Sequence, residues 1–280
     1  MEQQKIQLTP NHQVIVERFV AAGQRDPRIV AAFLGGSYAS GAADAHSDLD
    51  LYLITTDEAH EAFLAEREKF VRGLGEPLFL ADFGKAYYFF IIFDDGTEVE
   101  LGVGRESDFQ PIHGGAHTVL LDKHGLLTDV TFPLHEADPT EQRENLRRLV
   151  MNFWHEVGHF NQALARNQVW FAYGSLEELR HICVNLARLR HNFADASVGE
   201  EPFFKLEQAM PVEQLAPLQA TFCPLEIEAI RQAGAVLLQF YREAATTLAE
   251  RHGLVYPAAL ERVALAQQTP VDNEHLSAGG

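Results

Sequence analysis

The chain has 280 residues, enough for one large domain or two modest ones, and its composition of 46% apolar and 22% charged residues is ordinary for a globular protein. No apolar run approaches the roughly 18 residues that a membrane-spanning helix requires, so the sequence argues against a membrane protein. The formal net charge of -18 gives a surface that repels phosphate backbones, which argues against nucleic acid as the main partner.

The first 130 residues mix helical and strand patterns. Residues 9–24 predict a helix, with Thr9 as its cap and Pro10 at the first helical position. Residues 57–75 predict a single amphipathic helix that ends at a glycine. Asp94-Asp95-Gly96 between two apolar runs is a strong hairpin signal. Strands are predicted over residues 28–35, 49–55, 87–93, 97–104 and 117–122.

From Asp138 onward the sequence shows no strand pattern. Asp138 precedes a proline and begins a predicted helix, whose apolar stripe is Leu146, Leu149, Val150, Phe153, Val157, Phe160 and Leu164. Further helices are predicted from the capping-box-like Ser175–Glu178, over 224–253, and over 257–268. The sequence therefore predicts an α+β protein: a mixed sheet with helices over 1–136, an all-helical bundle over 137–268, and a disordered tail over 269–280.

The stretch FLGGSYASGAADAHSDLDLYLIT, residues 33–55, joins two predicted strands through a Gly-Gly-Ser turn. Asp48 and Asp50 lie two residues apart in an extended segment, so they face the same side, while the intervening leucines pack on the other. Two neighbouring carboxylates repel each other unless a cation lies between them, and Mg²⁺ binds carboxylate and phosphate oxygens together. Gly36 lets the backbone approach a phosphate, and Ser37 adds a hydroxyl. The stretch predicts a nucleotide and metal site at one edge of the sheet.

The predicted hairpin supplies a third acidic group. Glu98 and Glu100 share one face of their strand, opposite Val99 and Leu101. Either glutamate could bind a second metal or accept the proton of an attacking hydroxyl. The alternative is that both are ordinary solvent-facing strand residues. The combination of Gly-Gly-Ser, Asp-x-Asp and an acidic hairpin favours the functional interpretation.

These residues resemble a known signature. GGSYASGAADAHSDLDL is similar to the motif of the DNA polymerase beta-like nucleotidyltransferase superfamily, in which Gly-Ser (Gly36-Ser37) precedes Asp-x-Asp by a spacer of about ten residues. FDDGTEVELGVG resembles the hairpin that follows in aminoglycoside and lincosamide nucleotidyltransferases, where Glu100 occupies the position of the third acid, commonly an aspartate. TVLLDKHGLL resembles the next strand of those enzymes, and RNQVWFAYGSLEELRHICVNLARLR resembles part of their helical bundle.

The resemblance implies a catalytic domain over 1–136 that uses Mg²⁺ and ATP or another nucleoside triphosphate. Gly36, Ser37 and Ser47 are then the nucleotide-binding candidates. Asp48 and Asp50 would bind the metal. Glu100 would be a further metal ligand and would activate an acceptor hydroxyl for attack on the α-phosphorus, with release of pyrophosphate. The implied acceptor is a small hydroxyl-bearing molecule, such as an antibiotic of the aminoglycoside or lincosamide type, and the acidic surface of the chain suits a cationic one.

A second stretch, WHEVGHF over residues 154–160, allows a different chemistry. His155 and His159 are four residues apart on a predicted helix, with Glu156 between them, which is the spacing of zinc metallopeptidases. Glu177 or Glu178 lies at a suitable distance along the sequence to supply a third ligand. Two observations disfavour the zinc site: Ser175–Glu178 can be interpreted as a helix cap, and the 13 histidines of the chain make a chance pair more probable. A zinc metallopeptidase remains the alternative.

The bundle also offers candidates for binding the acceptor. Trp154, His155, Glu156 and Trp170 combine aromatic faces with an acid, which suits a polyhydroxylated or cationic substrate. Core packing is the alternative for both tryptophans. A further alternative is a nucleotidyltransferase-fold protein that acts on a macromolecular partner. The polar N-terminus and the two cysteines, which lack metal or redox spacing, predict a cytoplasmic protein. Either a monomer or a homodimer is expected, and the sequence does not choose between them.

Overall fold

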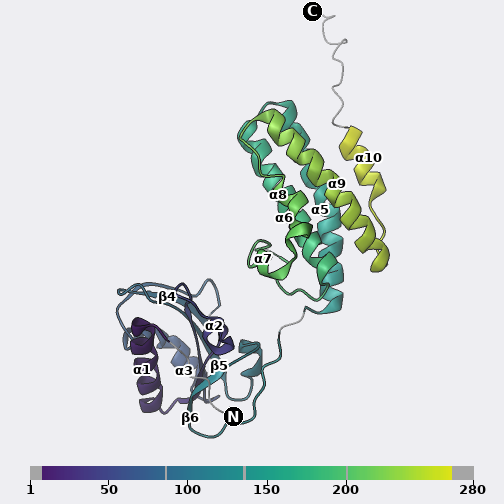
Figure 1. The fold of residues 1–280 in the computed structure, drawn as a ribbon. Coiled ribbons are helices and arrows are strands. Elements are labelled where there is room, and N and C mark those ends of the chain that lie inside the picture. The colour runs from purple at the N-terminus through teal and green to yellow at the C-terminus, as the bar shows by residue number, and fades with distance from the viewer. Residues whose placement is uncertain (1–7, 86, 135–136, 200, 267–280) are drawn as a thin grey trace, which may run out of the picture. The chain divides into compact units, whose positions relative to one another are not determined.

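The computed structural model describes residues 8–85, 87–134, 137–199 and 201–266. The chain divides into two compact units, Met1–His135 and Glu136–Gly280 (Figure 1). The tail predicted over residues 269–280 lies outside the described residues. Among the described residues, no helix combines the length and the hydropathy that crossing a bilayer would need.

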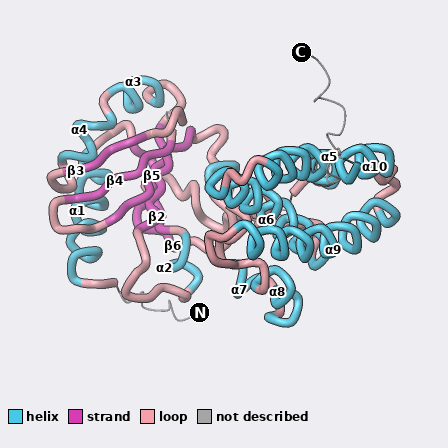
Figure 2. The backbone as a smooth tube through the Cα atoms, turned by 90° about the horizontal axis from the view of Figure 1, so that it is seen from above, coloured by secondary structure: helices cyan, strands magenta, loops and turns pink. Residues whose placement is uncertain are grey.

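The first unit contains a six-stranded mixed sheet with the strand order β3-β4-β5-β2-β1-β6 (Figure 2). Strands β2 and β5 run parallel, whereas the other neighbouring pairs are antiparallel. This confirms the mixed sheet of the predicted α+β fold. The strands are β1 (Ile29–Leu34), β2 (Leu49–Thr55), β3 (Pro77–Ala81), β4 (Tyr88–Phe93), β5 (Glu98–Arg105) and β6 (Thr118–Asp122).

Helices and loops cover the two faces of this sheet. The first unit contains α1 (Pro10–Arg25), α2 (Gly36–Ser40), α3 (His60–Ala65), α4 (Arg67–Arg72) and the 3₁₀ turn η1 (Gln110–Ile112). Thr9 caps α1, as predicted, by accepting a hydrogen bond from the backbone N–H of His12. On one face, Leu49, Leu51 and Leu53 of β2 pack against apolar residues of α1, α3 and α4. On the other face, Tyr52 packs with aromatic residues such as Phe33 and Phe132.

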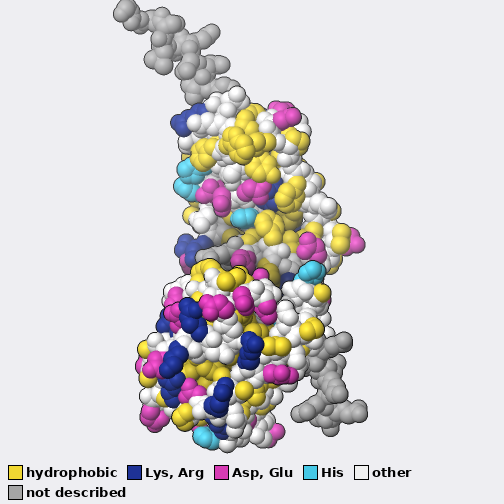
Figure 3. All heavy atoms as spheres, turned by 90° about the vertical axis from the view of Figure 1, so that its left-hand side faces the viewer, with side chains coloured by type: hydrophobic (Ala, Val, Ile, Leu, Met, Phe, Trp, Pro, Cys, Tyr) yellow, Lys and Arg dark blue, Asp and Glu magenta, His cyan; other side chains and the backbone are white. Residues whose placement is uncertain are grey.

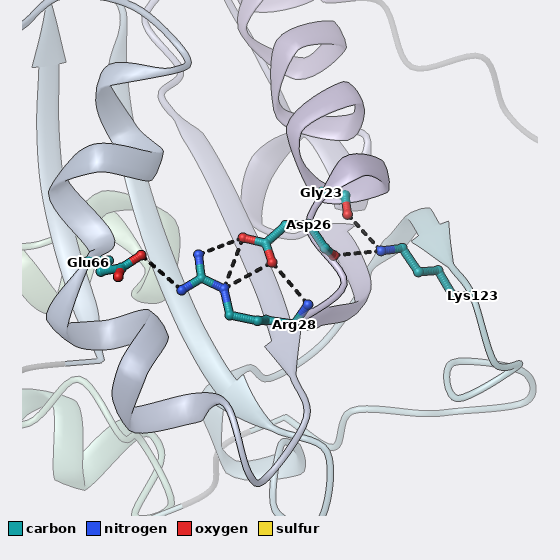
Figure 4. A network of polar contacts seen from close by, with 5 residues as sticks. All are labelled: Gly23, Asp26, Arg28, Glu66 and Lys123. Carbon is teal, nitrogen blue, oxygen red and sulfur yellow. Dashed lines mark hydrogen bonds and ion pairs between the residues drawn. The ribbon is translucent and has the colours of Figure 1, made fainter.

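A polar network ties several elements of the first unit together where α1 ends and β1 begins (Figure 4). The Asp26 carboxylate accepts hydrogen bonds from the backbone and the guanidinium of Arg28. Arg28 also pairs with Glu66, at 3.1 Å, in the link between α3 and α4. The Lys123 ammonium donates to the carbonyls of Gly23 and Asp26, each at 2.8 Å. The network therefore connects α1, β1, the α3–α4 link and the end of β6.

Two details of the first unit differ from the sequence prediction. The single helix predicted over 57–75 is wrong, because the chain leaves helical geometry at Glu66 (φ -103°, ψ 7°) and forms α3 and α4 instead. Phe63 and Val71 are buried on either side of this break, so the apolar spacing alone does not reveal it. Strand β3 was not predicted. It is an edge strand that starts with Pro77 and exposes Leu78 and Phe79, so it lacks the alternation of a half-buried strand.

The second unit is helical in all its described regular elements, which confirms the predicted bundle. Asp138 caps α5, as predicted, by accepting from the backbone N–H groups of Thr140 and Glu141. Phe153 of α5 stacks on Tyr241 of α9 with a centroid distance of 3.7 Å, and the Tyr241 hydroxyl donates to the Val150 carbonyl. The helices are α5 (Pro139–Ala165), α6 (Val169–His191), α7 (Leu206–Ala209), α8 (Val212–Gln219), α9 (Ile227–Arg251) and α10 (Ala258–Ala266).

The predicted start of the second helix near Ser175 is wrong. Helix α6 begins at Val169, and Ser175 is buried in its interior, 4% exposed. The turn between α5 and α6 is short because Asn167 adopts left-handed geometry (φ 53°), a conformation that asparagine tolerates better than most residues. The pair Ser175 and Glu178 therefore forms no helix cap, and the interpretation of this segment as a capping box fails.

Candidate active site

Three carboxylates meet on one face of the sheet in the first unit. The parallel register of β2 and β5 sets Asp50 beside Glu100, and Asp48 comes directly before β2. One carboxylate oxygen from each of Asp48, Asp50 and Glu100 can be chosen so that all three lie within 4.8 Å of one another. All three side chains are half-buried. Among the described residues, this is the one group of three or more His, Cys, Asp or Glu side chains spaced to hold a metal ion.

The Gly35-Gly36-Ser37 turn packs directly against this group. The Gly35 backbone N–H donates to the Asp50 carbonyl at 2.8 Å. Gly36 has a φ of +56°, in the left-handed region that favours glycine. A Cβ atom at Gly36 would lie 1.7 Å from Oδ2 of Asp50, so no side chain fits there. The turn can approach the carboxylate this closely only because residue 36 is glycine.

Ser37 presents a buried hydroxyl beside the same turn. Its Oγ has no hydrogen-bond partner among the residues that the structure describes. A buried hydroxyl without a partner is uncommon in proteins, because losing its hydration costs free energy that a hydrogen bond normally offsets. Such a group is suited to a ligand that brings its own acceptor atoms.

Glu100 lies in a more desolvated position than an ordinary surface glutamate. Burial raises the pKa of Glu100, the charge of Asp48 raises it further, and the hydrogen bond that the Tyr88 hydroxyl donates to Glu100 acts in the opposite direction. Burial also raises the pKa of Tyr88 and the pKa of Tyr52, so both phenols stay protonated. A glutamate with a raised pKa is a better proton acceptor near neutral pH than a fully solvated one.

The donor chemistry of the site fits a hard divalent cation. Asp48, Asp50 and Glu100 offer only carboxylate oxygens, the ligands that Mg²⁺ and Ca²⁺ prefer. Three neighbouring carboxylates repel one another, and a cation between them would remove that repulsion. The unpartnered Ser37 hydroxyl, next to the Gly36 turn that packs against Asp50, could bond to a phosphate oxygen.

Two other predicted residues of the first unit are not members of this metal-spaced group. The Ser47 hydroxyl accepts a hydrogen bond from the Asp44 backbone N–H at 2.9 Å, within the loop that leads to β2. Glu98 is exposed at the start of β5, two residues before Glu100. The structure thus distinguishes the two hairpin glutamates, which the alternating pattern alone treats alike.

The candidates in the second unit have different surroundings. Trp154 is 2% exposed and packs edge-on against Phe153 and Tyr241 in the helical core. Trp170 is 81% exposed near the start of α6. His155 is exposed and Glu156 is half-buried, both on α5. Their predicted role in binding the acceptor stays a prediction.

The His-Glu-x-x-His motif forms a pair rather than a complete ligand set. The Nε2 atoms of His155 and His159 are 3.2 Å apart. Within the described ranges, no third His, Cys, Asp or Glu joins these two imidazoles in a metal-sized group. The Glu177 carboxylate, a proposed third ligand, pairs instead with the buried Arg180. A zinc site of this type needs three protein ligands around one point.

Sequence reasoning missed the apolar neighbours of the acids. A pocket of about 250 Å³ adjoins Asp48, Glu98 and Glu100. Its remaining lining residues are Phe79, Phe83, Phe90, Ile91, Ile92 and Val99. The segment YYFFIIF carried a signal for part of this lining, since alternate residues of β4 share a face. Phe79 belongs to the strand that was not predicted.

Comparison with known proteins gives a family match over most of the chain. The family model described as streptomycin adenylyltransferase matches residues 10–266. A search of curated proteins found no match. Among solved structures, the chain is similar to an aminoglycoside 6-adenyltransferase from Bacillus subtilis, with 16% identity, coverage of 94% of this chain and 98% of that one, and a TM-score of 0.42. It is also similar to a nucleotidyltransferase-like protein from Exiguobacterium sibiricum 255-15, with 12% identity, coverage of 82% and 74%, and a TM-score of 0.38.

Proposed function

The chain belongs to the streptomycin adenylyltransferase family, and from this premise we propose that it transfers AMP from ATP to a hydroxyl of a small cationic molecule, with Mg²⁺ as the metal. Membership in the family makes it a nucleotidyltransferase that acts on an antibiotic-like substrate. The observation that carries the finer proposal is the convergence of Asp48, Asp50 and Glu100 beside the Gly36-Ser37 turn.

The proposal assigns the nucleotide and the metal to separate groups of residues. Gly36 and Ser37 would bind the triphosphate, since their turn packs against Asp50 and the Ser37 hydroxyl lacks a partner among the described residues. Asp48, Asp50 and Glu100 would hold Mg²⁺. The cation, when bound, would neutralise charge on the triphosphate, which makes the phosphorus easier to attack.

The reaction follows as an in-line displacement. The acceptor hydroxyl oxygen forms a bond to the α-phosphorus while the bond from that phosphorus to the bridging oxygen of the β-phosphate breaks. Pyrophosphate leaves with the electron pair of the broken bond, and the acceptor's proton moves to a carboxylate oxygen of Glu100. Tyr88 holds this carboxylate in position through its hydroxyl. The protein's contribution is then mainly positioning and charge stabilisation.

In this proposal the helical unit, residues 137–268, contributes to binding the acceptor, and residues 1–136 catalyse the transfer. The exposed candidates of the helical unit are His155 and Trp170, and Glu156, which follows His155 on α5, is half-buried. An acidic side chain and an exposed aromatic ring each suit a cationic acceptor.

The test is a screen of acceptors with α-labelled ATP. Streptomycin, other aminoglycosides and lincosamides are incubated with the protein, ATP and Mg²⁺, and pyrophosphate release is measured with and without each acceptor. We expect acceptor-dependent release together with transfer of label to the acceptor. The double variant Asp48→Asn, Asp50→Asn should lose this activity while it keeps the circular dichroism spectrum of the wild type. Wild-type turnover in the double variant would overturn the proposal.

A further inference from the structure

We propose that the apolar side chains of β3, β4 and their connecting loop form the acceptor subsite, and that this subsite selects a cation that carries an apolar face. The inference rests on the proposed nucleotidyl transfer and narrows the chemical class of its acceptor. The side chains concerned are Phe79, Phe83, Phe90 and Ile92, here called the phenylalanine wall.

The pairing of neighbouring strands determines which residues of the site lie side by side. Phe90 of β4 lies opposite Glu100 of β5, and Glu100 lies beside Asp50 of β2. The backbone N–H of Gly35, at the end of β1, bonds to the Asp50 carbonyl. Next to these residues, Phe79 of β3 pairs with Ile92 of β4, and Ile92 in turn pairs with Glu98 of β5. Moving across this face, one therefore meets aromatic rings, then carboxylates, then the glycine turn.

The phenylalanine wall forms one side of the 250 Å³ pocket that also contains Asp48, Glu98 and Glu100. Phe79, Phe83 and Phe90 are 43%, 68% and 36% exposed, and Ile92 is 37% exposed. The Phe83 ring packs edge-on against Phe90 with centroids 5.2 Å apart. Single exposed apolar residues are ordinary, but a contiguous apolar surface inside a pocket indicates a binding face.

The direction of the displacement assigns this pocket to the acceptor. An in-line reaction places the attacking oxygen and the leaving pyrophosphate on opposite sides of the α-phosphorus. The proposed phosphate-binding residues, Gly36 and Ser37, lie on one side of the carboxylates, and the phenylalanine wall lies on the other. Glu100, the proposed proton acceptor, borders the pocket directly. An acceptor seated against the wall would therefore present its hydroxyl on the attacking side.

The charge of the pocket selects the type of acceptor. Asp48, Glu98 and Glu100 are its charged lining residues, and none of its lining side chains is basic. Aromatic faces attract cations through the ring quadrupole, and neighbouring carboxylates add to that attraction. An ammonium or guanidinium group joined to a ring or hydrocarbon face satisfies both parts of the pocket. An anion would be repelled by Glu98, the lining carboxylate that is not assigned to the metal.

The first experiment separates the acceptor from the nucleotide by steady-state kinetics, with the acceptor that the screen identifies. The variants Phe79→Ser and Phe83→Ser should raise the KM for the acceptor about tenfold, while the KM for ATP stays unchanged. Leu78→Ser is the matched control. Leu78 is the neighbour of Phe79 on β3, is 71% exposed, and is not part of the pocket lining. A rise in the KM for ATP alone would mean that the wall binds the nucleotide base, and would overturn the inference.

The second experiment measures binding without turnover. Phe83→Trp places a fluorescent reporter in the pocket, and the signal of Trp154 and Trp170 is subtracted with the wild-type protein. Benzylamine, benzyl alcohol and benzoate present the same ring as a cation, a neutral molecule and an anion at pH 7. We expect benzylamine to bind about tenfold more tightly than benzyl alcohol, benzoate not to bind, and Glu98→Gln to reduce the preference.

The outcomes separate this inference from the proposed function. If the chain transfers no nucleotide but the reporter shows the cation preference, the pocket chemistry stands and the proposed function fails. If the chain transfers nucleotide but benzyl alcohol binds as tightly as benzylamine, or neither binds, the inference about the phenylalanine wall is wrong.

Discussion

The Asp50 carboxylate occupies the space that a side chain at residue 36 would need, so a substitution of Gly36 tests the site directly. Gly36→Ala should reduce both stability and transfer activity, because the alanine Cβ would overlap Oδ2 of Asp50 and the φ of +56° disfavours any L side chain by about 1–2 kcal/mol. Gly84→Ala is the matched control. Its φ is +81°, and a Cβ there meets nothing within 4 Å. Urea unfolding and transfer assays should show a larger loss for Gly36→Ala, and equal losses would show that the contact with Asp50 has no effect.

The two glutamates of β5 provide a second test. Glu100→Gln should lower the turnover number by about 10²- to 10⁴-fold, because it removes the proposed proton acceptor and one metal ligand. Glu98→Gln, two residues away on the same strand, should change turnover far less. Steady-state kinetics at saturating ATP measures both. Small and similar effects at the two positions would assign both glutamates to an ordinary solvent-facing strand.

The sequence predicted part of this site. The spacing of Asp48 and Asp50 placed both carboxylates on one side of a strand. In the structure the two carboxylates do lie together, and the leucines of β2 pack in the core of the opposite face. The same pattern could not distinguish Glu98 from Glu100 without the family resemblance. That distinction depends on which residue of β5 lies beside Asp50, and the register of two parallel strands far apart in the sequence has no local signal. The contact from Tyr88 to Glu100 depends instead on the register of the β4–β5 hairpin, in which Tyr88 pairs with Gly102 and its hydroxyl reaches diagonally to Glu100.

At the scale of secondary-structure elements, the polar network around Asp26 and Arg28 at the start of β1 predicts how the free energy of unfolding depends on pH. The Arg28 hydrogen bonds hold the pKa of Asp26 below its usual value. Because the folded-state pKa is lower than the unfolded one, the network stabilises the protein above the usual aspartate pKa, and this contribution is lost as the pH falls through the lowered value. Asp26→Asn should therefore destabilise the first unit at neutral pH, by about 1–3 kcal/mol.

Urea unfolding of wild type and Asp26→Asn at neutral and at acidic pH measures this effect. The difference between the two proteins should be large near pH 7. It should begin to shrink as the pH falls below the ordinary aspartate pKa of about 4, and it should vanish below the lowered pKa of Asp26, where the folded wild type becomes protonated. A difference that is independent of pH would show that the amide fails for steric reasons rather than through loss of the ion pair with Arg28.

The elements that the sequence missed share a physical reason. The break between α3 and α4 at Glu66, the edge strand β3, and the true start of α6 at Val169 all depend on tertiary contacts or on one residue's backbone angles. Elements with a strong local signal were predicted well. Helix α1 has a threonine cap and a proline at its first position, and the β4–β5 hairpin has Asp94-Asp95-Gly96, where Gly96 adopts a φ of +82°.

At the scale of the whole molecule, each compact unit has its own apolar core. The core residues of the helices lie within the second unit, and those of the sheet lie within the first. The net charge of -18 is carried on a mixed surface, and Figure 3 shows one face on which Asp and Glu side chains lie among Lys and Arg. Such a surface favours solubility and cationic ligands over polyanions.

Separate cores predict separate responses to cavity-forming substitutions. Leu34→Ala and Leu186→Ala each remove a fully buried side chain, one from the sheet core and one from the helical core. Each should cost about 2–5 kcal/mol in its own unit. Hydrogen exchange measured by mass spectrometry should show lost protection in β1 and β2 for Leu34→Ala, and in α5 and α6 for Leu186→Ala. Uniform loss across both units would contradict this expectation.

The parallel pairing of β2 with β5 also determines when the site can form during folding. The hairpin of β4 and β5 joins residues close in sequence, whereas the pairing of Asp50 with Glu100 closes a longer loop, so we expect the hairpin to form first. Mutual repulsion of the carboxylates opposes the same step, so divalent cations should accelerate refolding. A chain still emerging from the ribosome carries both aspartates well before β5 is complete, and it acquires the potential for catalysis only after residue 105 has been released.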